Sequence, residues 1–178
     1  GRSTYHAFTS KLEKRFSNGL QFLSSYTWGH ALSDVGTTLS GGPGQRDTHL
    51  SEEYANASFD IRHRMSNSFL YEVPVKFENK VVNAIAGGWQ MNGIYVIQTG
   101  NYFNLGTTNA VGSFGTVRPD VVDGQKVNDA PSGGRGPDLW FNTGGVQNPT
   151  VGTFGNLGNY SNIGPPRFNF DFSLFKDF

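Results

Sequence analysis

The chain ends with the stretch Phe168-Asn-Phe-Asp-Phe-Ser-Leu-Phe-Lys-Asp-Phe178, in which large apolar and small polar residues alternate. Side chains of a β-strand point to opposite faces in turn, so this alternation predicts a strand over residues 168–178. Its apolar residues share one face: Phe168, Phe170, Phe172 and Leu174. Termini of soluble domains are usually polar and frayed. An apolar face that runs up to a terminal aromatic is instead expected of a strand with lipid on one side and water on the other.

The same alternation recurs upstream. It predicts strands over residues 4–16, 20–28, 59–73 and 84–103. Two long segments rich in Gly, Pro and polar residues, 29–58 and 104–167, are predicted to be loops. Residues 1–178 are therefore expected to form an all-β antiparallel meander of about five long strands with two long loops. The 24 glycines, 15 phenylalanines and 16% charged residues agree with β structure.

The first two strands are expected to form a hairpin around Ser17-Asn18-Gly19. A two-residue Asn-Gly turn would pair Phe16 with Gln21 and mix apolar with charged faces. A three-residue loop with Gly19 in the left-handed position of a bulge pairs Phe16 with Leu20 instead. With that register, Ser10 faces Tyr26 and Phe8 faces Trp28, and the large apolar groups align. We therefore predict the three-residue loop.

Composition excludes several functional classes. The formal net charge is zero and no basic run is long enough for a nucleic-acid footprint. No cysteine is present, which excludes disulfides and thiolate catalysis. No window of eighteen apolar residues predicts a membrane helix, although barrel strands would escape such a test. The nucleophile, zinc-protease, phosphate-loop and dinucleotide motifs are absent, so no catalytic residue, no cofactor and no enzyme activity is expected.

Connection length predicts an orientation if the strands belong to an outer-membrane barrel. Periplasmic turns of such barrels are short and extracellular loops are long. The connections at Gly19 and Pro74, and the C-terminus, would then be periplasmic, and residues 29–58 and 104–167 extracellular. Five strands place the start of the first one outside, whereas bacterial single-chain barrels have even strand numbers. We therefore expect residues 1–178 to be the C-terminal portion of a barrel whose N-terminal part is missing from this chain.

A family resemblance rests on the order of several motifs. They are Lys11-Leu-Glu-Lys-Arg-Phe-Ser-Asn-Gly-Leu20, Ser25-Tyr-Thr-Trp28, Phe59-Asp-Ile-Arg-His-Arg64, Gly88-Trp-Gln-Met-Asn-Gly-Ile94, Trp140-Phe-Asn-Thr143 and Phe170-Asp-Phe-Ser-Leu-Phe175. Together they resemble the C-terminal part of TonB-dependent outer-membrane receptors whose N-terminus carries a carboxypeptidase-regulatory-like domain. The resemblance implies a non-catalytic structural segment of a receptor or transporter in the bacterial outer membrane, within a 22-stranded barrel that holds a plug. No segment matches the plug or the TonB-contacting box.

The resemblance also implies partners. The final strand is similar to the assembly signal of bacterial outer-membrane barrels, carried here by Phe168, Phe170, Phe172, Leu174 and Phe178. Expected partners are outer-membrane lipid, the barrel-assembly machinery, and the remainder of the barrel with its plug. Nucleic acid is not expected. Self-association through open strand edges is a further expectation.

Two clusters are candidate sites. Asp60, Arg62 and Arg64 share the predicted inward face, where they would grip an anionic ligand or the plug; alternatively they solvate a wide lumen and pair with neighbouring strands. The transported ligand itself is unknown. Glu52 and Glu53, with Asp47 and His49, invite a metal site. Their spacing matches no known metal loop, so a solvated acidic loop without metal is expected.

A different class of protein also fits the alternation. The apolar stripe would serve equally as an inner face of a soluble β-sandwich. The alternative function is a secreted or surface β-rich module that self-associates into oligomers or fibres or binds glycans. Against it, the predicted strands exceed the usual length of about five or six residues, and the loops alternate in length by side.

Overall fold

The computed structural model describes residues 1–35, 45, 49–107 and 117–177. Two compact units make up the chain. The sheet unit consists of Ala7–Trp28, Arg62–Thr99 and Pro166–Phe178, and the loop unit of Gly1–His6, Gly29–Ile61 and Gly100–Pro165. Each unit has its own internal packing.

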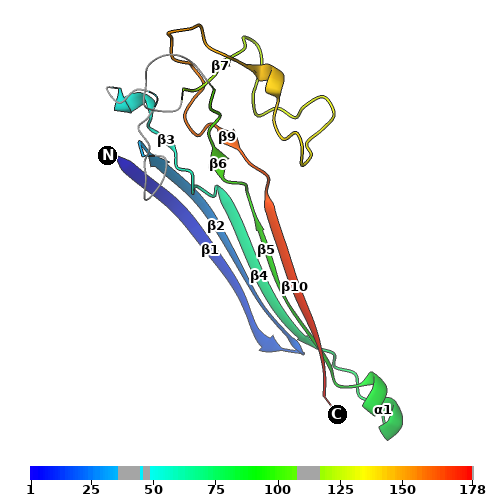
Figure 1. Ribbon diagram of the computed structural model, residues 1–178. Helices are drawn as coiled ribbons and strands as arrows, with labels where there is room; N and C mark the ends of the chain where they lie inside the picture. Colours follow the sequence, from blue (N-terminus) through cyan, green and yellow to red (C-terminus); the bar gives the residue numbers. More distant parts are fainter. Residues whose placement is uncertain (36–44, 46–48, 108–116, 178) are drawn as a thin grey trace. The chain divides into compact units, whose positions relative to one another are not determined.

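Five long strands form an antiparallel sheet in the order β1-β2-β4-β5-β10 (Figure 1). Their bounds are Ser3–Ser17 for β1, Leu20–Ser33 for β2, His63–Glu72 for β4, Trp89–Gln98 for β5 and Arg167–Lys176 for β10. Each long strand pairs with the next long strand along the chain, which confirms the predicted all-β meander. Within the described residues the sheet is open, with β1 and β10 at its edges.

The turn between β1 and β2 differs from the prediction. Asn18 and Gly19 have φ values of +53° and +77°, and the strands end and begin directly beside them, as in a two-residue type I′ turn. The predicted three-residue loop was therefore wrong. Farther along the hairpin, however, the Oγ1 atoms of Thr9 and Thr27 lie 3.3 Å apart. That contact lies between the predicted pairs Ser10–Tyr26 and Phe8–Trp28 and agrees with the register predicted for this part of the hairpin.

A helix replaces the start of the strand predicted over residues 84–103. Helix α1 spans Lys80–Ala86, and Asn79 caps it by accepting hydrogen bonds from the backbone N–H groups of Val81 and Val82. Apolar residues at helical spacing and this cap override the period-two pattern. Gly88, with φ of +69°, then reverses the chain into β5. The end of the predicted strand is the separate short strand β6, Tyr102–Phe103.

The strand predicted over residues 59–73 begins only at His63. The four residues before it lie outside the strand because the backbone turns: the N–H of Asp60 donates to the carbonyl of Ala57 at 2.9 Å. Strand β2, which precedes the connection to β4, is longer than predicted. It continues five residues beyond its predicted end at Trp28, to Ser33.

The loop unit is built from short pieces around a small core. Strand β3 (Ala55–Asn56) pairs with the end of β2, β6 with β9 (Asn162–Ile163), and β7 (Asp120–Val121) with β8 (Val146–Gln147). Two 3-10 turns, η1 (Leu50–Glu52) and η2 (Thr143–Gly145), complete it. Among the residues that the structure describes, its buried apolar side chains are few and mostly small: Ala31, Ala57, Val117, Val127 and Leu157. With so little apolar burial, polar contacts must contribute much of this unit's order.

Candidate functional site: the two faces of the sheet

One face of the sheet is apolar across its strands. The register places Phe22 opposite Phe69, Phe69 opposite Gly93, and Gly93 opposite Phe172. Directly opposed residues share a face, so Phe22, Phe69, Gly93 and Phe172 lie on the same face. Because side chains alternate along a strand, this row determines the face of each remaining residue in β2, β4, β5 and β10. The large side chains on it are Leu20, Phe22, Tyr26, Trp28, Met65, Phe69, Tyr71, Met91, Tyr95, Ile97, Phe168, Phe170, Phe172 and Leu174.

Aromatic contacts join neighbouring positions on the apolar face. The rings of Tyr95 and Phe168 meet edge to face with centroids 5.1 Å apart. A Cβ atom on Gly93 would lie 2.7 Å from a ring carbon of Phe69, so that ring covers the glycine. Polar residues also lie on this face, among them Ser24, Asn67 and His63. His63, opposite Trp28, bonds through Nδ1 to the Tyr26 hydroxyl at 2.8 Å. The apolar surface is therefore continuous over the glycine.

The apolar face has no covering layer. On β10, Phe168, Phe170, Phe172 and Leu174 are 65%, 51%, 51% and 53% exposed. A soluble sandwich would bury these side chains against a second sheet. No second sheet of the described residues does so. The β-sandwich interpretation is therefore wrong for this part of the chain.

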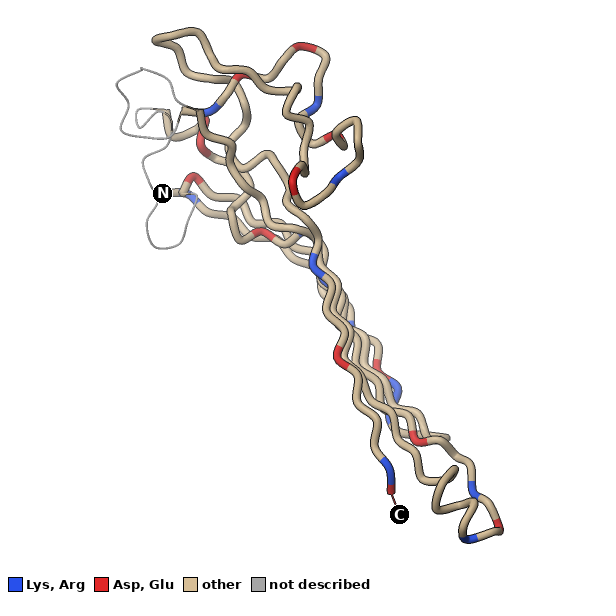
Figure 2. The backbone as a smooth tube through the Cα atoms, turned by 45° about the vertical axis from the view of Figure 1, so that its right-hand side comes forward, with Lys and Arg blue, Asp and Glu red and all other residues tan. Residues whose placement is uncertain are grey.

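The opposite face is mainly polar. It carries Gln21, Ser25, Thr27, Arg64, Ser66, Ser68, Asn92, Gln98, Asn169, Asp171 and Ser173. Asn169 donates to the Asp171 carboxylate at 2.7 Å, which ties two alternate positions of β10 on this face. Charged residues are spread along the strands and loops without a long run of one sign (Figure 2).

Two arginines stand at one end of the polar face. Gln98 of β5 lies opposite Arg64 of β4 on one side and Arg167 of β10 on the other. Neither guanidinium has an ion-pair partner among the residues that the structure describes. The predicted final strand began at residue 168, so the sequence analysis missed Arg167. The position of Arg167 opposite Gln98 follows from the pairing of β5 with β10. The residues of one strand alone do not indicate that pairing.

The predicted cluster of Asp60, Arg62 and Arg64 is only partly a feature of the strand. Arg64 lies within β4, on the polar face, whereas Arg62 precedes the strand. Asp60 belongs to the loop unit, is 2% exposed, and accepts a hydrogen bond from the backbone N–H of Ala31 at 2.8 Å. The prediction that all three share one strand face was wrong because the extended pairing starts at His63. Asp60 is a structural carboxylate.

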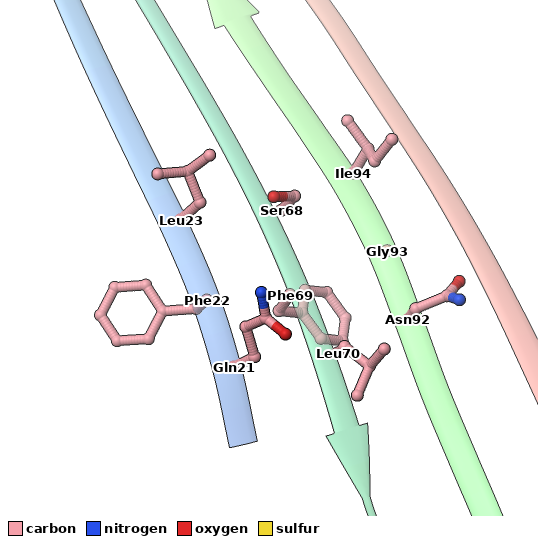
Figure 3. Close-up of a pocket in the computed structure, with 9 residues that line it drawn as sticks. All are labelled: Gln21, Phe22, Leu23, Ser68, Phe69, Leu70, Asn92, Gly93 and Ile94. Carbon is pink, nitrogen blue, oxygen red and sulfur yellow. The ribbon is translucent and has the colours of Figure 1, made fainter. Parts of the chain in front are cut away.

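A hollow of about 370 Å³ lies in the middle of the polar face (Figure 3). Polar Gln21, Ser68 and Asn92 line it together with apolar Leu23, Leu70 and Ile94. Small Ser68 stands between Leu23 and Ile94 in the register, which leaves the depression. The hollow is thus a mixed patch on an otherwise polar face.

Glu53 is buried rather than solvated, whereas its acidic neighbour Glu52 is exposed. Glu53 and Arg118 form an ion pair at 2.7 Å, with side chains only 3% and 7% exposed. The second carboxylate oxygen of Glu53 accepts the N–H of Gln45, whose side chain in turn bonds to the N–H of Arg118 and the carbonyl of Gly155. The solvated-loop interpretation was therefore wrong for Glu53. Asp47 lies outside the described residues.

A family model described as "Outer membrane beta barrel domain" matches residues 1–178. The chain belongs to this family. Curated proteins and solved structures gave no match. The outer membrane beta barrel domain places the chain in the bacterial outer membrane, as predicted.

Family membership assigns the two faces. In an outer membrane beta barrel domain, outward side chains form an apolar band against lipid and inward ones are polar. The apolar face defined above corresponds to the lipid side of such a domain, and the polar face corresponds to its lumen side. No described helix has the length and apolarity required to cross a membrane. The described residues also hold no group of three or more His, Asp or Glu side chains arranged to bind a metal ion.

Proposed function

We propose that the chain is a non-catalytic structural segment of a TonB-dependent outer-membrane receptor or transporter. The observation that supports this most directly is an antiparallel sheet of long strands with one apolar and one polar face. The order of motifs from Lys11 to Phe175 supports the receptor type, because it resembles that of TonB-dependent receptors along the chain.

The proposal includes an orientation. The β1–β2 turn, the connection that carries α1 and the end of β10 all lie at one end of the sheet (Figure 1). These would be periplasmic, since short connections face the periplasm in such barrels. The connections from β2 to β4 and from β5 to β10 would be extracellular. In the described parts of these connections, short paired strands and the buried Glu53–Arg118 ion pair support a defined structure.

Partners follow from the two faces and the final strand. Lipid would contact the apolar face, and the plug would contact the lumen face, where Leu23, Leu70 and Ile94 offer it an apolar patch. The barrel-assembly machinery would recognise the final strand, whose Phe168, Phe170, Phe172 and Leu174 form one exposed stripe. Phe178 lies outside the described residues. Further barrel strands would pair with the outer edges of β1 and β10.

Cross-linking in the native bacterium tests the receptor type. A purification tag inserted after Val151, which is 80% exposed, would recover the protein from outer membranes after treatment with a cross-linker. We expect mass spectrometry to find the TonB protein cross-linked to it during ligand uptake. A correctly assembled barrel that never cross-links to TonB would contradict the receptor type and leave the barrel assignment intact.

One observation bears on self-association. Beyond β2 and β5, the edge strands β1 and β10 have no sheet partner in the described part of the chain. Such edges recruit other strands. Heating in detergent separates the outcomes, because a closed barrel changes gel mobility only on boiling, whereas edge-to-edge oligomers form a ladder of sizes.

A further inference from the structure

The helix between β4 and β5 presents apolar side chains to its surroundings. Val81 and Ile85 are 68% and 69% exposed, and Val82 is 42% exposed. Residues three and four apart lie on the same side of a helix, so Val82 and Val81 both lie beside Ile85. Phe77 and Val75, in the segment that leads into α1, are also exposed. A connection in contact with water alone gains nothing from this arrangement.

The polar residues Asn79 and Asn83 form hydrogen bonds within the connection that carries α1. The side-chain oxygen of Asn83 accepts a hydrogen bond from the backbone N–H of Phe77 at 3.0 Å. The backbone carbonyl of Asn83 accepts another from the N–H of Gly87. Asn79 caps the first turn. A helix of seven residues is unstable in isolation. These hydrogen bonds stabilise α1 and leave the side that carries Val81, Val82 and Ile85 exposed.

The helix is also attached to the margin of the lipid face. Trp89 is the first residue of β5, two positions before Met91 on the same face, and its indole N–H donates to the carbonyl of Ile85 at 3.1 Å. The ammonium of Lys176 lies 5.6 Å from the centroid of the Trp89 ring and bonds to the carbonyl of Gly87. Trp and Lys are the residue types that mark the boundary between lipid and water.

We propose that α1 is an interfacial anchor that lies in the phospholipid layer at the periplasmic surface of the outer membrane. Val81, Val82 and Ile85 insert toward the acyl chains, and Lys76 and Lys80 lie among the headgroups. The occupant is lipid, because Trp89 joins α1 to the apolar face that the proposed barrel turns toward lipid. This inference rests on the proposed orientation of the barrel.

Single labelled thiols test the anchor, since the chain has no cysteine of its own. The variants Val81→Cys and Ile85→Cys report on the apolar side of α1, and Glu78→Cys is the matched control just before the helix cap. Phe170→Cys reports on the lipid face of the sheet. Each protein is purified from outer membranes, labelled with a small fluorophore and reconstituted into vesicles of phosphatidylethanolamine and phosphatidylglycerol with brominated acyl chains. The unsubstituted protein serves as the blank.

We expect bromine to reduce the fluorescence at positions 81, 85 and 170, and aqueous iodide to reduce it only at position 78. Quenching at 170 by bromine, together with quenching at 81 and 85 by iodide, would overturn the anchor and leave the barrel. Labels at 81 and 85 that are shielded from both quenchers would also overturn it, because protein would then cover the helix. Failure of bromine at position 170 would overturn the contact of the apolar face with lipid and the anchor together.

Discussion

Gly19 shows how a single residue determines the β1–β2 turn. Its φ of +77° is unfavourable for any side chain, and a Cβ atom there would lie 2.5 Å from the carbonyl oxygen of Glu72. Two independent effects therefore require glycine, one local and one from the neighbouring strand. A sequence pattern detects the first effect, through Asn18-Gly19, and cannot detect the second.

The substitution Gly19→Ala should destabilise the folded sheet by about 1–3 kcal/mol, with the close contact to Glu72 adding to the backbone strain. Gly124→Ala is the control, because Gly124 has a similar φ of +76° and open space around it. Urea unfolding of the two variants in lipid measures the difference. Equal losses of stability would show that the Glu72 contact has no effect.

At the scale of an element, successive residues of β10 lie alternately on the apolar and the polar face of the sheet. Phe170→Arg should destabilise the barrel by about 2–4 kcal/mol if it places a charge near the middle of the membrane. Ser173→Arg, on the other face of the same strand, should change stability little. The free energy of unfolding in phospholipid vesicles distinguishes them. A reversed order would mean that the lipid and lumen faces have been exchanged.

A buried ion pair, Glu53–Arg118, joins the connection from β2 to β4 to the connection from β5 to β10. Glu53→Gln leaves the guanidinium of Arg118 without its charge partner, and loss of one partner from a buried ion pair costs about 3–5 kcal/mol. We expect proteases to cleave residues 49–61 and 117–165 much faster in this variant, with the strands still protected. Glu52→Gln, an exposed neighbour, is the matched control. Unchanged cleavage in Glu53→Gln would contradict a structural role for the pair.

At the scale of the whole molecule, Arg64 and Arg167 at the end of the polar face test the proposed role in transport. If Arg64 and Arg167 contact an anionic ligand, replacing both with Gln should raise the concentration for half-maximal uptake about tenfold or more, since a hydrogen bond to a charged group contributes about 1.5–3 kcal/mol. Lys11→Gln, whose partner is Glu13, is the control. Normal uptake with normal assembly would favour the alternative that these arginines only solvate the lumen.

Much of the architecture could be predicted because it is local. Alternation of side chains along a strand depends only on backbone geometry, so Phe168, Phe170 and Phe172 determined their common face without any partner. The same pattern determined five long strands and which side of each is apolar. Which of the two faces meets lipid stays a prediction, and it depends on the same alternation.

Other features were decided only by the tertiary structure. Glu53 and Arg118 are 65 residues apart in sequence, and their burial depends on two connections folding together. Arg64, Gln98 and Arg167 form a row only after three strands have paired. Residues 84–86, predicted to begin a strand, belong instead to helix α1, which Asn79 caps. Local pattern thus determined the faces, whereas pairing between distant segments decided the register and the neighbours on each face.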